Sequence, residues 1–153
     1  MSAILRLDRL LARVEAAGVG LVLSFMILAS AAQWLIRTAG ATTSGEVEIL
    51  VRFGVLWMAA LGGALATQRQ RHLAIDAVVR VLPQGSARIV GRASSVLAAA
   101  MCAGATHAAA GFVREEWAFG RTQAGLPEAA LLSILPVAFA LMSFHFLVGV
   151  LRR

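Results

Sequence analysis

Three histidines and one cysteine are the side chains with the most chemistry to offer: His72, Cys102, His107 and His145. His107 and His145 each lie inside a long apolar stretch, where two histidines could hold a haem iron. If both stretches cross a membrane as helices, the two imidazoles are offset by roughly 9–10 Å along it at about 1.5 Å per residue, which is too far for one iron. A single cysteine forms neither an internal disulfide nor a cysteine-based zinc site. We therefore expect no catalytic residue, no metal ligand and no cofactor.

Long runs without charge determine the class of protein. The chain is 59% hydrophobic and 14% charged, whereas an ordinary soluble domain is about 45–50% apolar and about 25% charged. Charge-free residues fill Ala16–Ile36, Ala93–Val113 and Ala129–Leu151, and a shorter run covers Phe53–Gln68. Because about 20 apolar residues cross a bilayer as a helix, the sequence indicates a polytopic membrane protein. It excludes a soluble enzyme, a nucleic-acid-binding module and a secreted disulfide scaffold.

The predicted fold is all-α, with one membrane domain over residues 1–153 that contains four transmembrane helices and short amphipathic interfacial helices. We predict the spans at about 16–37, 46–68, 89–113 and 128–151, and the interfacial helices at about 2–14 and 71–82. The N-terminal segment also resembles a cleaved signal peptide, but apolar sequence continues to Ile36, so we expect an uncleaved first span. If the N-terminus is cytoplasmic, ten of the 14 arginines lie inside. The positive-inside rule therefore predicts that both termini are cytoplasmic.

Two opposite charges, Glu48 and Arg52, lie in the first turns of the second predicted span. Residues four apart share one face of a helix, so the two side chains can pair. Charges are costly inside a bilayer and less so near its surface. Three interpretations remain open: a pair that satisfies itself at the membrane surface, a polar contact with another membrane subunit, and a role in a transport site.

The segment 71–82 has the pattern of a helix that lies on a membrane surface. His72, Asp76 and Arg80 recur every four residues and form one polar stripe, and apolar residues cover most of the remaining circumference. Pro83 and Gly85 are the residues expected to end such a helix. With 12 residues the segment is too short to span a bilayer, so we expect it at the cytoplasmic interface.

Small residues dominate the third predicted span. Ala100, Gly104 and Ala108 form a small-xxx-small row, a pattern that lets helix backbones approach closely. We expect this row to pack inside the chain's own bundle, with Gly62 and Gly63 as counterparts on the second span.

A proline interrupts the fourth predicted span. Pro136 cannot donate a backbone hydrogen bond, so we expect a kink and a freed carbonyl group. In a membrane, neighbouring groups must satisfy such a carbonyl.

The charge-free runs that make up most of the first, third and fourth predicted spans are 21 to 23 residues long, so no acidic or basic residue lies near the middle of these spans. A coupled transporter usually carries ionisable groups near the membrane midplane, or discontinuous helices that open onto a site. The sequence also has no cluster with zinc-ligand spacing and no glycine-rich phosphate loop. We therefore expect a scaffold that supports another protein, not an enzyme or a carrier acting alone.

Several short motifs, taken in order, resemble a known family. They are Trp57 with Gly62-Gly63-Ala64, the run Arg71-His72-Leu73-Ala74-Ile75-Asp76 that closes at Leu82-Pro83, and Gly125-Leu126-Pro127-Glu128 followed by Pro136. With its length and four spans, the chain resembles the small (DctQ-like) integral membrane subunit of tripartite ATP-independent periplasmic (TRAP) transporters. The likeness covers almost the whole chain.

The resemblance implies a role and a set of partners. Such a subunit braces a large membrane transport subunit in the bacterial inner membrane, and a periplasmic binding protein delivers an organic acid for ion-gradient-driven uptake. The partners implied are the large subunit, the binding protein and membrane lipid, with no nucleic acid. The residues that we expect at a partner or lipid interface are Glu48, Arg52, Trp57, His72, Asp76 and Arg80. The outer segments Thr38–Val47 and Glu115–Pro127 would face the binding protein.

Three alternatives stay open at this point. The chain could be the small subunit of another tripartite carboxylate transporter. It could be a membrane anchor subunit of a redox enzyme, with a haem on His107 and His145 or without one. It could also be a free-standing small membrane protein that associates with itself through the small residues of the third span.

Overall fold

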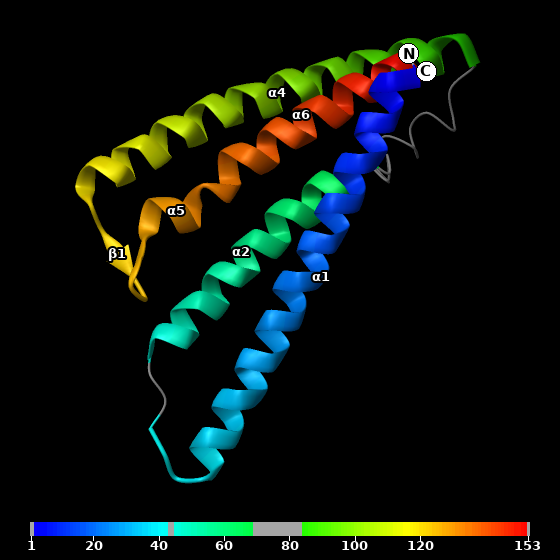
Figure 1. Cartoon of the computed structure of the whole chain (residues 1–153). Helices are drawn as coiled ribbons and strands as arrows, with labels where there is room; N and C mark the ends of the chain where they lie inside the picture. The colour runs from blue at the N-terminus through cyan, green and yellow to red at the C-terminus, as the bar shows by residue number, and fades with distance from the viewer. Residues whose placement is uncertain (1, 43–44, 69–83, 153) are drawn as a thin grey trace.

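The computed structural model describes residues 2–42, 45–68 and 84–152 (Figure 1). Its elements are α1 (Ser2–Thr38), α2 (Gly45–Gln68), α4 (Gln84–Phe119), β1 (Thr122–Gln123), β2 (Leu126–Pro127), α5 (Glu128–Leu132) and α6 (Ile134–Arg152). Four segments are long and apolar enough to cross a membrane: Ile4–Thr38, Gly45–Gln68, Ile89–Phe119 and Glu128–Val150. The predicted all-α class with four spans is therefore confirmed.

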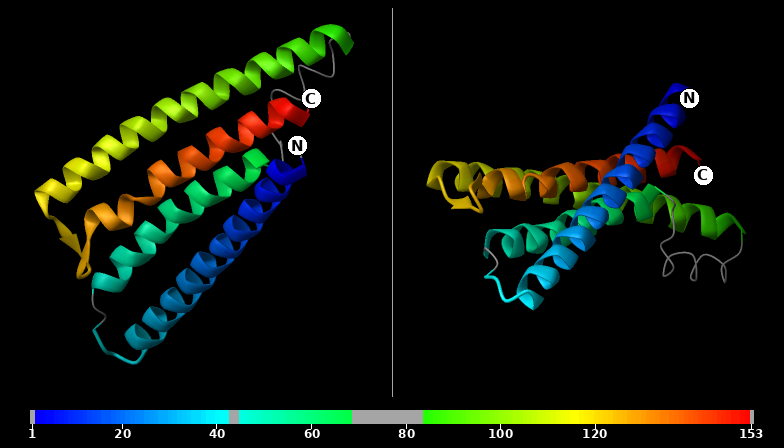
Figure 2. Two further views of the ribbon diagram at one scale, coloured as in Figure 1. Left: turned by 45° about the horizontal axis from the view of Figure 1, so that its top comes forward. Right: turned by 60° about the horizontal axis from the view of Figure 1, so that its bottom comes forward.

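The helices form a fan that opens away from the chain termini (Figures 1 and 2). α1 and α2 make one antiparallel pair, and α4 makes another with the fourth span; α2 and α6 pack together between α1 and α4. The N-terminal end of α1 and the C-terminal end of α6 lie at the same end of the molecule (Figure 1). The C-terminal end of α1 and the β1–β2 hairpin lie at the opposite end (Figure 1).

Two of the helices are longer than a bilayer requires. α1 has 37 residues and α4 has 36, which corresponds to about 55 Å each, whereas the hydrocarbon core of a bilayer is about 30 Å thick. The segment 2–14, expected as a separate interfacial helix, continues without a break into the first span. No glycine or proline precedes Gly18, so nothing in the sequence ends the helix at that point.

Small residues of α2 allow its close packing on both sides. Ala64 is fully buried, and Ala60 forms a buried core with Ile134 and Ala138 of the fourth span. On the other side, a Cβ added at Gly54 would lie 2.9 Å from Cγ of Met26 in α1. Glycine and alanine at these positions therefore determine how closely α1 and α6 approach α2.

The prediction that the small-residue row of the third span packs inside the bundle is wrong. Ala100, Gly104 and Ala108 are all exposed on α4, and a Cβ added at Gly104 would meet nothing within 4 Å. α4 instead packs on the fourth span through the other side of the helix, where Ala99 is buried. The expected counterparts on α2 do not meet this row either, because α2 packs against α1 and α6.

A tight hairpin joins α4 to the fourth span. β1 and β2 pair antiparallel, with Thr122 opposite Pro127 and Gln123 opposite Leu126. The two turn residues, Ala124 and Gly125, have φ values of 49° and 74°. Left-handed backbone at both positions is the geometry of a two-residue hairpin turn, and glycine supplies one of them without strain.

Candidate functional site

The break in the fourth span is stabilised by a tryptophan from α2. α5 and α6 are separated at Ser133, whose backbone N–H and hydroxyl both donate to the carbonyl of Ala130. The indole Nε1 of Trp57 donates a 2.8 Å hydrogen bond to the carbonyl of Leu131. Pro136 lies in the first turn of α6, where a missing N–H leaves no helical bond unmade. The predicted interruption of the fourth span is confirmed, and Trp57 donates to a carbonyl beside it; this carbonyl belongs to Leu131 and not to Leu132, the residue four before Pro136.

Trp57 thus has a role within the chain that the sequence did not indicate. Its ring is half-buried against the core of α2 and the fourth span. The part of the ring that stays exposed is available to lipid or to another subunit, so its predicted position at an interface remains a prediction.

The predicted pairing of Glu48 and Arg52 is confirmed. Nη2 of Arg52 lies 3.6 Å from Oε1 of Glu48. The Arg52 side chain is 77% exposed and the Glu48 side chain is 59% exposed. An exposed ion pair of this kind contributes only about 0–1 kcal/mol. The pair therefore does little for the fold, and both charges remain available to a partner.

The other three predicted interface residues, His72, Asp76 and Arg80, lie outside the described residues. The interfacial helix predicted over 71–82 lies there as well. Their part in an interface stays a prediction.

The two histidines of the spans lie in unlike environments. His107 is exposed on α4, whereas the His145 imidazole is fully buried. Nδ1 of His145 lies 2.8 Å from Oδ1 of Asp8, and Nε2 lies 2.9 Å from Oε1 of Glu15. Because both ring nitrogens of His145 are occupied, the two histidines do not form a ligand pair for haem. Among the described residues, no group of three or more His, Cys, Asp and Glu side chains is arranged to hold a metal ion.

A buried carboxylate anchors the β1–β2 hairpin between α4 and α5. Glu116, at the end of α4, is buried and accepts hydrogen bonds from Nε and Nη2 of Arg121. Nε of Arg121 also lies 3.4 Å from Oε2 of Glu128, and its guanidinium stacks 5.7 Å from the ring centre of Phe119. The hydrogen bond and charge of Glu116 raise the pKa of Arg121 above its usual value. One arginine therefore ties both ends of the hairpin together.

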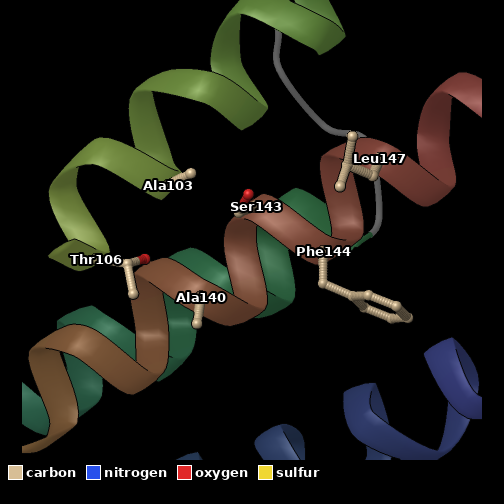
Figure 3. A pocket seen from close by; sticks show the side chains of 6 residues that line it. All are labelled: Ala103, Thr106, Ala140, Ser143, Phe144 and Leu147. Carbon is tan, nitrogen blue, oxygen red and sulfur yellow. The ribbon is translucent and has the colours of Figure 1, made fainter.

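An open pocket of about 320 Å³ lies between α4 and α6 on one side of the bundle. Figure 3 shows the residues that line it: Ala103, Thr106, Ala140, Ser143, Phe144 and Leu147. The hydroxyl of Thr106 donates to the carbonyl of Cys102, and that of Ser143 donates across to the carbonyl of Ala99 on α4. Because both hydroxyl protons are used by backbone carbonyls, the pocket suits an apolar occupant.

Comparison with known families identifies the chain. The family model of the DctQ component of tripartite ATP-independent periplasmic transporters matches residues 6–153. The chain belongs to this family. No curated protein and no solved structure gives a significant match. The family match indicates that the chain is the small component of a TRAP transporter.

In this DctQ component, sequence reasoning missed the contacts of Asp8 and Glu15 with His145. The two carboxylates are seven residues apart, about two helical turns, and so share one face of α1. That spacing, in a segment rich in leucine, was the signal available. The histidine is 137 residues from Asp8 and 130 from Glu15, so only the tertiary fold could reveal the contact.

Proposed function

We propose that this DctQ component braces the large membrane transport subunit of a TRAP transporter in a bacterial inner membrane. Both termini lie in the cytoplasm, as the arginine distribution predicts. The complex takes up an organic acid that a periplasmic binding protein delivers, and an ion gradient drives the transport. The family match supports the role as a small TRAP subunit. The carrier chemistry then belongs to the large subunit.

The exposed face of α4 is the structural feature that best supports this proposal. Ala100, Gly104 and Ala108 lie along it, with the larger Leu97 and Met101 beside them. Small residues let a second helix approach closely in a membrane. Among the described residues of this chain, α4 packs on the fourth span through its other side and leaves the row exposed. We therefore assign this face to the large subunit.

The position of His107 favours a protein partner over lipid at the same face. The residue follows Gly104 by three positions and is exposed, so its polar ring points outward from an apolar span. Polar side chains inside a membrane usually face other protein groups or a water-filled cavity. A polar group on a helix of the large subunit would satisfy the imidazole, whereas acyl chains would not.

The ends of the molecule supply the remaining contacts. The hairpin held by Arg121 offers the periplasmic binding protein a well-ordered surface within the segment 115–127. We assign the segment 38–47 to the same partner. Glu48, Arg52 and Trp57 on α2, together with His72, Asp76 and Arg80, hold the large subunit or the lipid surface.

An affinity pull-down of the tagged chain from its native membrane in mild detergent tests this function. We expect a large polytopic partner in near-equal amount, identified by mass spectrometry. Recovery of the chain alone, or with a flavin or iron–sulfur subunit, would contradict the proposal.

A further inference from the structure

Asp8, Glu15 and His145 form a buried polar cluster between the first half of α1 and the second half of α6. The side chains are almost completely inaccessible, with exposed fractions of 2%, 3% and 0%, respectively. Asp8 and Glu15 belong to α1, and His145 belongs to α6. The imidazole lies between the two carboxyl groups and contacts one with each ring nitrogen. The cluster therefore links α1 directly to the fourth span.

Two hydrogen bonds at this imidazole need one proton more than the separated groups carry. An ionised carboxylate only accepts, and a neutral imidazole has a single N–H. With both carboxyl groups ionised, one of the two short contacts would join an oxygen to a nitrogen lone pair. Both contacts become hydrogen bonds only if an additional proton is bound, either on the imidazole or on a carboxyl group.

The two carboxyl groups differ in how well their oxygens are satisfied. Oδ2 of Asp8 accepts a 3.1 Å hydrogen bond from Nε2 of Gln68, while Oδ1 faces the imidazole. Asp8 has a further interaction as well. Oε2 of Glu15 is buried and has no hydrogen-bond partner. A buried ionised carboxylate with an unpartnered oxygen is costly, and a protonated carboxyl group is much less so.

We propose that Glu15 and His145 form a proton-binding site that holds α1 against α6. The proton lies between Oε1 of Glu15 and Nε2 of His145, and His145 donates its Nδ1–H to Asp8. When the proton leaves to solvent, a carboxylate faces a lone pair at 2.9 Å, and the contact between the helices weakens. This inference does not depend on the proposed transport function.

The sign of the pH dependence follows from the proton count. In water at neutral pH a separated carboxyl group is ionised and an imidazole is mostly neutral. The site with α1 held against α6 therefore binds one more proton than the site with the two helices apart. The contact between the helices is favoured at low pH and weakens as the pH rises. One proton changes the equilibrium between the two by up to about tenfold per pH unit.

Among the described residues, the printed contacts at the imidazole and the two carboxyl groups come from α1, α2 and α6. α1 supplies Asp8 and Glu15, and α2 supplies the uncharged amide of Gln68. α4 packs on the other flank of α6 and buries Ser95, whose hydroxyl donates to the carbonyl of Gly91 on its own helix. The pH dependence is therefore assigned to the two carboxyl groups and the imidazole.

Thermal unfolding of the full chain in lipid nanodiscs, between pH 5 and pH 9, tests the site. We expect the midpoint of the wild type to fall as the pH rises. Glu15→Gln places an amide N–H where the bound proton lies, so this variant should keep both hydrogen bonds and lose that part of the pH dependence. Asp8→Asn is the matched control: the amide oxygen still accepts from Nδ1 of His145, the Gln68 amide can turn its oxygen toward the new N–H, and the contact between Glu15 and His145 is unchanged.

Three outcomes would overturn the inference. They are a flat wild-type profile, a Glu15→Gln profile that falls as steeply as the wild type, and an Asp8→Asn profile as flat as that expected for Glu15→Gln. If the Glu15→Gln variant does not accumulate, the wild type and Asp8→Asn still test the inference, because the unfolding midpoint of both must fall as the pH rises.

Discussion

The indole N–H of Trp57 in α2 donates a 2.8 Å hydrogen bond to the backbone carbonyl of Leu131, next to the break between α5 and α6. A proline in the fourth span and a tryptophan in the second are thus two parts of one feature. The tryptophan donates to a carbonyl beside the break, and its ring packs on the core that includes Ala60 and Ile134.

Trp57→Phe should destabilise the chain by about 1–3 kcal/mol, because it keeps an aromatic ring but leaves the Leu131 carbonyl without its donor. Trp34→Phe is the control, since Trp34 is 65% exposed on α1. Thermal or denaturant unfolding in one detergent measures both. Equal stability of the two variants would show that the hydrogen bond does not support the break.

Gly54→Ala should destabilise the pair of α1 and α2, because the added Cβ would lie 2.9 Å and 3.0 Å from Cγ and Sδ of Met26. Overpacking of this kind costs about 1–3 kcal/mol. Gly62→Ala is the matched control: its Cβ meets nothing within 4 Å, and alanine is the better helix former. Unfolding midpoints that rise equally in both variants would contradict the close packing at Gly54.

The sequence predicts some of these features because they are local, and misses others because they depend on distant residues. Charge-free runs indicate the four spans, and spacing alone brings Glu48 and Arg52 together. Hydrophobicity does not show which side of α4 faces outward, since both sides are apolar, and Gly104 was placed inside the bundle for that reason. Asp8 and Glu15, the two partners of His145, lie in the N-terminal part of α1, where the sequence predicts charges that face water.

Arg121→Gln should loosen the β1–β2 hairpin, because the buried carboxylate of Glu116 loses the two hydrogen bonds from the guanidinium. We expect chymotrypsin to cleave near Phe119 at least several-fold faster in this variant. Arg114→Gln is the control, since Arg114 is exposed and bonds only to the carbonyl of Ala110 among the contacts described. Identical cleavage rates in the two variants would refute the role of Arg121.

Between pH 5 and pH 9 the stabilising contribution of the Arg121 charge to the hairpin should not change. Glu116 raises the pKa of Arg121 above its usual value, so its stabilising contribution is fully present below the ordinary arginine pKa and is lost only as the pH rises through the higher folded value. Chymotrypsin cleavage, corrected for the enzyme's own pH profile, checks this. A cleavage rate that rises steadily from pH 7 to pH 9 would contradict it.

Asp76→Ala should lower organic-acid uptake by weakening the complex, if the polar stripe of His72, Asp76 and Arg80 holds the large subunit or lipid. Uptake and recovery of the large subunit should fall together. Normal uptake with normal assembly would remove Asp76 from the interface.

The claim that the exposed face of α4 binds the large subunit is tested most directly by Gly104→Leu against Gly20→Leu. Both glycines are exposed in a membrane span, and at both an added Cβ would meet nothing within 4 Å, so neither change should harm the chain itself. Overpacking an interface costs about 1–3 kcal/mol, and 1.4 kcal/mol is about tenfold in affinity. We predict that Gly104→Leu reduces co-purification of the large subunit about tenfold and that Gly20→Leu leaves it unchanged. Equal recovery with both variants would contradict the account.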